Sequence, residues 1–321
     1  MKKTILVTGG AGFIGSRYIR YLLHTYEHID VINADALKYA AQLENVAAFV
    51  EDPRYQFLKC DLTDESAMRN LFKFPIDEVV HFAAESHVDR SIDHVDPFVQ
   101  SNVVGTTRLI EAVRRMGVKR MVHVSTDEVY GSVSHGYLDE SAPLAPRNPY
   151  AASKASSDLL CMAAVHTHGL PIVISRCTNN YGPHQHQEKL IPKLIGRALQ
   201  HRSLPLYGNG EQIRDWIHVD DHCTAIDAIR CRGRTGEIYH VSAEETKTNI
   251  EMAKSILEIL EKPSSLIQFV GDRPGHDERY ALSAQKLRSE LFWQPRISLM
   301  QGLKETVKWY RRQEERREGW R

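Results

Sequence analysis

Two short segments of the chain carry residues whose types and spacing could support oxidation and elimination. Tyr150 and Lys154 are four residues apart, so on a helix they share one face, where the ammonium could lower the pKa of the phenol. Such a phenolate is a base for an alcohol that is being oxidised. Asp127 and Glu128 are adjacent at the end of a strand pattern and offer an acid and a base for removing water from a carbon skeleton. Few proteins need both pairs, so the combination predicts an enzyme that oxidises its substrate and dehydrates it.

A glycine-rich turn near the N-terminus predicts the site of the oxidant. The apolar run 4–8 leads into this turn and then into a helical pattern over 13–25. Glycines there allow a tight turn and close approach of the backbone to a pyrophosphate at the helix N-terminus. Asp35 ends a second strand-like run, where a carboxylate accepts hydrogen bonds from ribose hydroxyls and repels a 2′-phosphate. The pattern therefore predicts NAD rather than NADP, held first by Gly9, Gly12, Phe13, Ile14 and Gly15.

Strand and helix patterns alternate through the first half of the chain, which is typical of a doubly wound α/β fold with a parallel sheet. The strand-like runs are 4–8, 29–33, 55–59, 78–82, 120–125 and 171–176, and the helical stretches are 13–25, 64–73, 97–116 and 150–168. Later helices are expected near 188–200, 220–230, 249–261 and 299–316, the last with a capping box of Ser298 and Gln301. We expect a Rossmann-type domain over 1–177 that includes 213–242, and a smaller, partly discontinuous α+β domain over 178–212 and 243–321.

The carboxyl ends of the strands in such a sheet gather ligand-binding residues at one edge. Successive strand patterns are followed by the glycine turn, Asp35, Asp61, residues 82–86 and residues 126–128. We expect Asp61 to face the adenine side of a dinucleotide. The small turn of Phe82, Ala83 and Ala84 leaves room for the cofactor to pass. The second half of the chain then has to supply the groups that hold the substrate.

Composition and charge argue against several classes of protein. The 321 residues include 41 basic and 41 acidic side chains, so no overall charge favours nucleic acid or an anionic membrane. The five cysteines are scattered without a Cys-x-x-Cys pair, which suits free thiols in a reducing compartment. No apolar run is long enough for a signal peptide or a membrane span, so we expect a soluble, cytoplasmic protein. His184 and His186 have no acidic or cysteine partner at ligand spacing, so we expect no metal site.

These motifs resemble the extended short-chain dehydrogenase/reductase superfamily of nucleotide-sugar enzymes and, within it, the dTDP-glucose 4,6-dehydratase family. The glycine turn and the Tyr150/Lys154 pair carry the wider resemblance. The closer resemblance rests on segments 82–91, 126–128, 176–183, 188–192 and 272–277. It extends from the first strand to the last helix. Ala41, where the family commonly has glycine, and a short loop over 132–139 depart from the family pattern.

The resemblance implies that dTDP-glucose becomes dTDP-4-keto-6-deoxyglucose and water, a step of deoxysugar biosynthesis such as that of rhamnose. Tyr150, its pKa lowered by Lys154 and by the positive nicotinamide, would take the proton of the C4 hydroxyl while hydride passes from C4 to NAD. Thr126 would hydrogen-bond the same oxygen. Glu128 would then take the C5 proton while Asp127 protonates the departing C6 hydroxyl, and the hydride would return to C6. Asp127 must hold its proton near neutral pH, so we expect desolvation and the charge of Glu128 to raise its pKa.

The resemblance also implies further binding residues. For the cofactor it adds Leu37, Leu62, Ser101, Asn180, Tyr150 and Lys154. For the nucleotide sugar it implies Ser86, His87, Thr126, Asn179, Lys189, Leu190, Pro205, Tyr207, Arg214, Asn249, Arg273 and His276. Arginines pair with phosphate, amides hydrogen-bond and Tyr207 can pack on a ring. By analogy we expect a homodimer through the helices near 97–116 and 150–168, although their apolar faces could instead only cover the sheet.

Each motif also has a simpler interpretation. A Tyr-x-x-x-Lys spacing arises by chance on many helices, and adjacent acids commonly form a solvated turn. A nucleotide-sugar 4-epimerase or decarboxylase on the same scaffold is an alternative, which the Asp127/Glu128 pair disfavours because epimerisation needs no elimination acid. A non-enzymatic NAD-sensing protein is a second alternative, disfavoured because such proteins commonly lose the tyrosine or the lysine. No residue specifies thymidine over uridine, since one methyl group contributes only about 1 kcal/mol of apolar contact.

Overall fold

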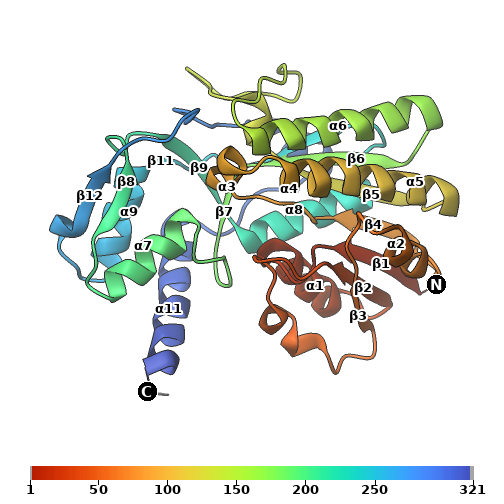
Figure 1. Ribbon diagram of the computed structural model, residues 1–321, viewed down its shortest axis with the longest axis horizontal. Coiled ribbons are helices and arrows are strands. Elements are labelled where there is room, and N and C mark those ends of the chain that lie inside the picture. Colours follow the sequence, from red (N-terminus) through yellow and green to blue (C-terminus); the bar gives the residue numbers. More distant parts are fainter. Residues whose placement is uncertain (1, 319–321) are drawn as a thin grey trace.

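A seven-stranded parallel sheet forms the core of the larger lobe (Figure 1). The computed structural model describes residues 2–318. The strands lie in the order β10 (Ile238–Val241), β6 (Ile172–Cys177), β5 (Arg120–Thr126), β4 (Glu78–His81), β1 (Lys3–Thr8), β2 (Ile29–Asp35) and β3 (Tyr55–Lys59). The strand order reverses between β1 and β4, and open α/β sheets bind ligands at such a switch point, beyond the carboxyl ends of the strands. The expected doubly wound fold is confirmed.

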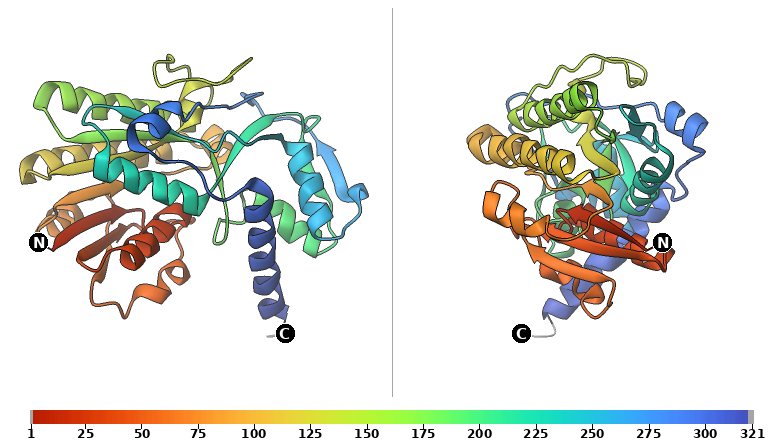
Figure 2. Two further views of the ribbon diagram at one scale, coloured as in Figure 1. Left: turned by 180° about the vertical axis from the view of Figure 1, so that it is seen from behind. Right: turned by 90° about the vertical axis from the view of Figure 1, so that its right-hand side faces the viewer.

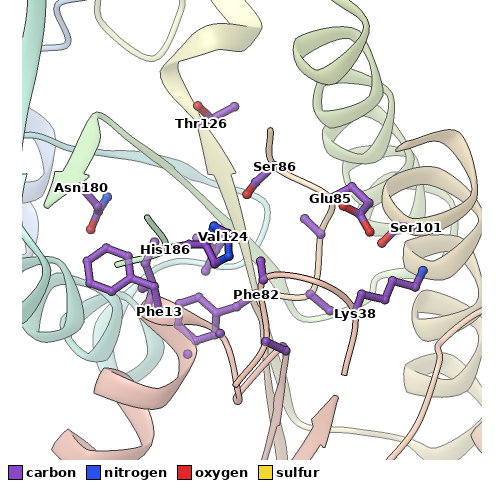
Figure 3. Close-up of a pocket in the computed structure, with 18 of the residues that line it drawn as sticks. Phe13, Lys38, Phe82, Glu85, Ser86, Ser101, Val124, Thr126, Asn180 and His186 are labelled. Carbon is purple, nitrogen blue, oxygen red and sulfur yellow. The ribbon is translucent and has the colours of Figure 1, made fainter. Parts of the chain in front are cut away.

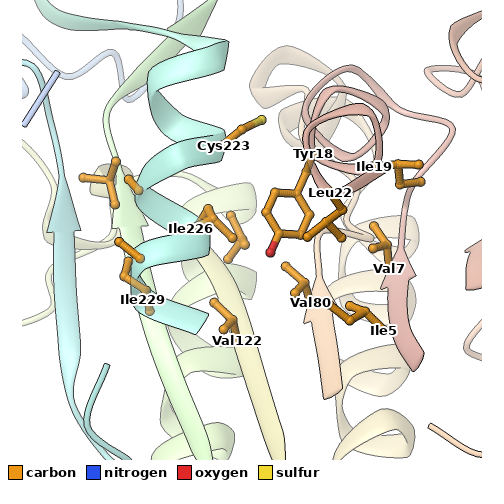
Figure 4. Packing of buried hydrophobic residues seen from close by; sticks show 14 of the residues in the cluster. Ile5, Val7, Tyr18, Ile19, Leu22, Val80, Val122, Cys223, Ile226 and Ile229 are labelled. Carbon is orange, nitrogen blue, oxygen red and sulfur yellow. The ribbon is translucent and has the colours of Figure 1, made fainter. Parts of the chain in front are cut away.

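Helices cover both faces of this sheet because alternate strand residues point to opposite sides. On one face α1 (Phe13–Thr25), α8 (Val219–Arg232) and α10 (Gln285–Leu291) form one apolar cluster with the strands, which includes Ile5 and Val7 (Figure 4). On the other face α2 (Glu65–Leu71), α5 (Thr106–Met116) and α6 (Pro149–His168) form a second apolar cluster, which includes Leu6. Packing of the helices on both faces holds the strands in place, so the carboxyl ends of the strands form a rigid edge.

The helix expected over 97–116 is present but contains an irregular centre. It consists of α4 (Asp96–Phe98), a π-helical stretch η3 (Val99–Gly105) and α5. Within η3, Asn102 is buried, and its side chain donates to the Glu85 carbonyl at 2.9 Å and accepts from the Glu85 backbone N–H at 2.8 Å. The wide turn therefore fixes the segment that follows β4, and π-helical turns are frequent at functional sites.

The smaller lobe lies beyond one end of the sheet (Figures 1 and 2). Its two sheets comprise β7 (Asn179–Tyr181), β9 (Ile213–His218) and β11 (Thr246–Thr248), and β8 (Leu204–Tyr207) paired with β12 (Ile267–Val270). Its helices α7 (Leu190–Leu199), α9 (Asn249–Ile259) and α11 (Leu299–Glu318) enclose a separate apolar core. Short helices η1 (Leu43–Asn45), η2 (Ala47–Phe49), α3 (Val88–Asp93), η4 (Asp127–Tyr130) and η5 (Ser264–Leu266) complete the described chain.

The packing refines two expectations from the sequence. Within the expected extension of the Rossmann domain to 213–242, α8 and β10 pack with the larger core, whereas β9 pairs with strands of the smaller lobe. Helix α10, which we assigned to the smaller domain, packs with the larger core through Leu287 and Leu291. A full capping box lies at Thr248 and Glu251. At α11, the Gln301 N–H donates to the Ser298 hydroxyl at 3.4 Å, and no reciprocal bond occurs among the described contacts.

Within residues 2–318, no helix combines the length and apolar character needed to cross a membrane.

Candidate active site

A large cavity runs along the carboxyl edge of the sheet, at the switch between β1 and β4 (Figure 3). All five predicted catalytic residues line it: Thr126, Asp127, Glu128, Tyr150 and Lys154. Every predicted cofactor residue except Leu37 also lines it: Gly9, Gly12, Phe13, Ile14, Gly15, Asp35, Asp61, Leu62, Phe82, Ala83, Ala84, Ser101, Tyr150, Lys154 and Asn180. Residues separated by up to 180 positions along the chain, from Gly9 to Lys189, are therefore brought to one place.

The glycine turn has the shape that a bound dinucleotide requires. Gly9 adopts φ 71°, and a Cβ atom on it would lie 2.7 Å from the Ala83 backbone nitrogen. A Cβ on Gly15 would collide with the Gly9 carbonyl. Helix α1 begins directly after this turn, without an acidic residue in its first turn and without a side-chain cap on Gly12. Its positive end is therefore directed at the cavity without a competing carboxylate, which suits a pyrophosphate.

Asp35 is fixed at the end of β2 beside the turn. Its Oδ2 accepts from the Ala11 N–H at 2.9 Å and its Oδ1 from the Leu37 N–H at 2.8 Å. Burial raises the pKa of Asp35, and these two backbone hydrogen bonds oppose the rise. Leu37 itself adopts φ 55°, a left-handed conformation that turns the chain sharply after the carboxylate. Each carboxylate oxygen retains a lone pair for a ribose hydroxyl, so the arrangement fits NAD.

The strand β5 ends in Thr126, which caps the short helix η4. The Thr126 hydroxyl donates to Asp127 Oδ1 at 3.1 Å and accepts from the Glu128 N–H at 3.3 Å. Asp127 is buried, and burial, followed by the nearby charge of Glu128, raises its pKa well above the usual range. The expected rise and both of its expected causes are confirmed. The other oxygen of Asp127, Oδ2, is buried without a hydrogen-bond partner among the described residues, so it remains available to a ligand.

Helix α6 carries Tyr150 and Lys154 into the same region, but their electrostatics differ from the expectation. The pKa of Tyr150 is raised, first by burial and then by the charge of Glu128. Lys154 Nζ donates to the Val124 carbonyl at 2.8 Å, and burial lowers the pKa of Lys154. The expected lowering of the Tyr150 pKa by Lys154 is therefore wrong for this conformation, because the ammonium is held by the strand and burial dominates.

The predicted substrate residues divide into two groups. Ser86, Thr126, Asn179 and Lys189 line the cavity. Lys189 Nζ donates to the Ser86 carbonyl at 2.5 Å and links the lobes, while Asn179 Oδ1 is buried without a partner among the described contacts. The others do not line this cavity: His87, Leu190, Pro205, Tyr207, Arg214, Asn249, Arg273 and His276.

Several members of the second group nevertheless lie together, because Asp89 connects them. Arg273 donates to Asp89 Oδ1 at 2.9 Å, and the Tyr207 hydroxyl donates to Oδ2 at 3.1 Å. The rings of Tyr207 and His276 are 6.0 Å apart. Asp89 belongs to the larger lobe, so one carboxylate joins both lobes beside the substrate side. The sequence analysis missed this role, since a carboxylate in a segment of mixed polarity gives no signal of its distant partners.

Comparison with known proteins identifies the family. A family model described as GDP-mannose 4,6 dehydratase matches residues 6–306. A dTDP-glucose 4,6-dehydratase from Actinoplanes sp. is 47% identical over 312 residues, which cover 96% of this chain and 97% of that protein. The crystal structure of DesIV (dTDP-glucose 4,6-dehydratase) from Streptomyces venezuelae, with NAD and TYD bound, is 46% identical with a TM-score of 0.95 and coverage of 97% and 98%. The chain belongs to the dTDP-glucose 4,6-dehydratase family.

The fold alone does not separate this dehydratase family from related enzymes. UDP-glucuronic acid 4-epimerase from Bacillus cereus, in complex with UDP-glucuronic acid and NAD, matches with a TM-score of 0.91 at 28% identity, over 97% of this chain and 99% of that one. The choice between dehydration and epimerisation therefore depends on the side chains in the cavity. Asp127 and Glu128 both lie at its wall, and an acid and a base are what elimination needs and epimerisation does not.

Further residues of the dehydratase cavity escaped the sequence analysis. They include Lys38, Tyr39, Glu85, Gln185, His186 and Glu188. The Arg90 guanidinium lies 3.8 Å above the Tyr39 ring, and the His186 ring is 5.8 Å from it on an edge-to-face geometry. The sequence signal that could have indicated Lys38 and Tyr39 is a cation followed by an aromatic residue soon after Asp35. Ala41 closes an ordinary turn by donating to the Lys38 carbonyl at 2.9 Å, without a positive φ, so glycine is not needed there.

Proposed function

We propose that this chain converts dTDP-glucose to dTDP-4-keto-6-deoxyglucose and water, as a dTDP-glucose 4,6-dehydratase in deoxysugar biosynthesis, of which rhamnose synthesis is one example. The observation that carries the proposal is a single cavity that contains both Tyr150 with Lys154 and Asp127 with Glu128. The first pair suits oxidation of an alcohol and the second suits loss of water.

The proposed oxidation begins at the C4 hydroxyl. NAD, when bound, supplies the hydride acceptor for C4 and the hydride donor for C6. Tyr150 removes the hydroxyl proton, and Thr126, at the end of β5, hydrogen-bonds the same oxygen. Burial raises the pKa of Tyr150 and so favours its protonated form. The positive nicotinamide ring of bound NAD, beside the phenol, would oppose this effect and favour loss of the proton. Lys154 fixes the start of α6 against β5 through the Val124 carbonyl.

The proposed elimination uses the two acids that follow Thr126. The 4-ketone acidifies the C5 proton, which Glu128 takes. The electron pair forms the C5–C6 double bond while the C6 hydroxyl leaves with the proton of Asp127. Burial and Glu128 keep Asp127 protonated, as this step requires. A proton then returns to C5, and the 4-keto-6-deoxy sugar is complete.

Binding residues complete the proposal. The glycine turn would hold the pyrophosphate of NAD, and Asp35 would hold its adenosine ribose. Asp61, paired with Lys38 at 3.4 Å, would lie on the adenine side. For the nucleotide sugar we assign Arg214 and Arg273 to the diphosphate. The Arg273 Nε is buried without a partner among the described contacts, which leaves a donor for phosphate.

The other proposed substrate contacts follow from their positions. Ser86, Asn179 and Lys189 line the cavity, and we assign them to the sugar. Tyr207 and His276 form an edge-to-face pair that suits the nucleotide base. His87, Leu190, Pro205 and Asn249 complete the set, and Asn249 Oδ1 is buried without a partner among the described residues.

Isotope transfer tests the whole cycle. Substrate deuterated at C4 should yield product that carries the deuterium at C6, because one bound cofactor serves both positions. In heavy water, solvent deuterium should enter at C5. Mass and proton spectra of the product measure both labels. An epimerase would return the label to C4, a decarboxylase would release carbon dioxide from a uronic acid, and an NAD-sensing protein would move no label, so each of these results would refute dehydration.

We further propose that the protein is a homodimer formed through α6 and the helical run over 96–116. Helix α6 packs beside α4 and η3, and these helices expose Val95, Val99, Leu159 and Leu160. Leu159 is 59% exposed, and such apolar groups on adjacent helices are typical of a protein interface. A cytoplasmic location also remains part of the proposal, since all five cysteines are free thiols.

Sedimentation tests the dimer. The wild-type protein should sediment with the mass of two chains, and Leu159→Glu should shift it to one chain because a charge would be buried at the centre of the interface. Val50→Glu, at an exposed apolar position directly after η2 and outside these helices, is the matched control and should leave the mass unchanged. A wild-type protein that sediments as a single chain at all concentrations would contradict the proposal.

A further inference from the structure

Asn148 lies at the junction of the two catalytic pairs and uses both ends of its amide. Its Oδ1 accepts from the Ala151 N–H at 2.8 Å and so caps the N-terminus of α6. Its Nδ2 donates to Glu128 Oε2 at 3.1 Å. The side chain is buried, and its backbone is extended, as is typical of an N-cap residue. One amide therefore connects the start of α6 with the Glu128 carboxylate of η4.

Glu128 is held on one oxygen only. The Tyr280 hydroxyl lies 3.5 Å from the same Oε2 and is itself fixed by Asp277 Oδ2 at 2.5 Å. No hydrogen bond within the described part of the chain involves Glu128 Oε1. The Tyr280 proton is directed to Asp277, which is the shorter contact, so Asn148 is the group that orients the Glu128 carboxylate through Oε2. The other oxygen, Oε1, is left for a proton from the substrate.

The helix that Asn148 caps carries Tyr150 and Lys154. The cap determines where α6 begins, with Pro149 as its first residue. Movement of Glu128 relative to Tyr150 would therefore require the Asn148 amide to break one of its two hydrogen bonds. The Asn148 side chain therefore links the carboxylate of Glu128 directly to the start of the helix that carries Tyr150.

We propose that Asn148 is a positioning residue, which fixes Glu128 relative to helix α6 so that the sugar oxidised at Tyr150 already has its C5 proton beside Glu128 Oε1. This inference rests on the dehydratase function proposed above and adds a residue to it. Positioning of this kind changes the rate of one step, because a misplacement of about 1 Å can slow a reaction about 100-fold.

An amide suits this task better than a cation. Glu128 is already near ionisable groups on several elements: Asp127, Tyr150, Lys189, Arg214 and Tyr280. A further cation in direct contact would stabilise the carboxylate and make it a weaker base. A neutral N–H donor orients the carboxylate with a smaller electrostatic effect.

Cap-preserving substitutions isolate the contact with Glu128. Serine caps helices as well as asparagine does, but its hydroxyl is too short to reach Glu128. In Asn148→Ser we expect C4 oxidation within about 2-fold of wild type and elimination slower by about 10-fold, since only the second step needs Glu128 in place. NADH should therefore accumulate on addition of dTDP-glucose. In Asn148→Asp a second carboxylate faces Glu128, so elimination should fall further at neutral pH and its pH profile should move to higher pH.

A remote cap provides the control. Asp64 caps α2 by accepting from the Ser66 and Ala67 N–H groups. Asp64→Ala should lower the melting temperature by about 2 °C and leave the ratio of oxidation to elimination unchanged. Equal slowing of both steps in Asn148→Ser would show that the residue acts only through helix stability, and unchanged kinetics would show that the contact is irrelevant. Either result would overturn the inference.

A crystal structure of Asn148→Ser separates this inference from the proposed function. A displaced Glu128 carboxylate beside an intact α6 is the expected result, and it can be observed without substrate. A Glu128 carboxylate in its wild-type place would overturn the inference. If the wild-type protein does not release water from dTDP-glucose, the proposed function fails, and the crystal structure still decides whether Asn148 positions Glu128.

Discussion

Tyr150→Phe is expected to abolish both C4 oxidation and loss of water, with each falling by about 1,000-fold as the base of the first step is removed. The substitution deletes only the hydroxyl. The ring lies 6.3 Å from Phe98 in an edge-to-face contact, which phenylalanine can keep. Absorbance of NADH after mixing with dTDP-glucose measures the first step, and the mass of the product measures the second. Both signals should disappear together, because elimination depends on the 4-ketone.

A tyrosine on the opposite side of the sheet serves as the matched control. The Tyr26 hydroxyl donates to Asp227 Oδ2 of α8 at 2.6 Å, and Tyr26 does not line the cavity. Tyr26→Phe also deletes one hydrogen-bonded hydroxyl and should lower stability by about 1 kcal/mol without reducing either kinetic step. A normal NADH burst in Tyr150→Phe would contradict the assignment of Tyr150 as the base.

The sequence predicted those parts of the site that follow from parallel-sheet geometry. Residues after successive strands must meet at one edge, so Gly9, Asp35 and Thr126 could be placed together without knowledge of the fold in detail. The raised pKa of Asp127 was also predictable, because an adjacent carboxylate and a strand end imply both repulsion and burial. Periodicity likewise predicted α1 over 13–25 as the structure has it.

Other features depend on long-range contacts that no local pattern encodes. The direction of Lys154 depends on the Val124 carbonyl, thirty residues away, and not on its spacing from Tyr150. Asp89 meets Arg273 across 184 positions. One role of Asn148 is predictable, since asparagine before proline indicates an N-cap. Its hydrogen bond to Glu128 is not predictable, because it depends on how α6 is placed relative to the end of β5.

Glu128→Gln is expected to separate oxidation from elimination. The variant should form NADH at close to the wild-type rate, while product falls by about 100-fold because an amide cannot accept the C5 proton. Glutamine has the shape of glutamate, and its amide oxygen can accept the hydrogen bond from Asn148 Nδ2 that Glu128 Oε2 now accepts. The side chain should therefore stay in place, and the loss should reflect the missing base. Stopped-flow NADH absorbance followed by product mass measures the two steps in one sample.

Asp127, the acid next to Glu128, determines which intermediate should accumulate in Glu128→Gln. Glu128 is the second-largest cause of the raised pKa of Asp127, after burial, so Asp127 remains a buried acid when the charge of Glu128 is removed. Oxidation should therefore stop at an accumulated 4-keto sugar that has a proton donor at C6 and no acceptor at C5. Glu211→Gln removes the charge of an exposed glutamate and should leave both steps unchanged. Normal turnover by Glu128→Gln would mean that another group removes the C5 proton. The proposed role of η4 in dehydration would then be wrong, because Glu128 is the base that η4 supplies.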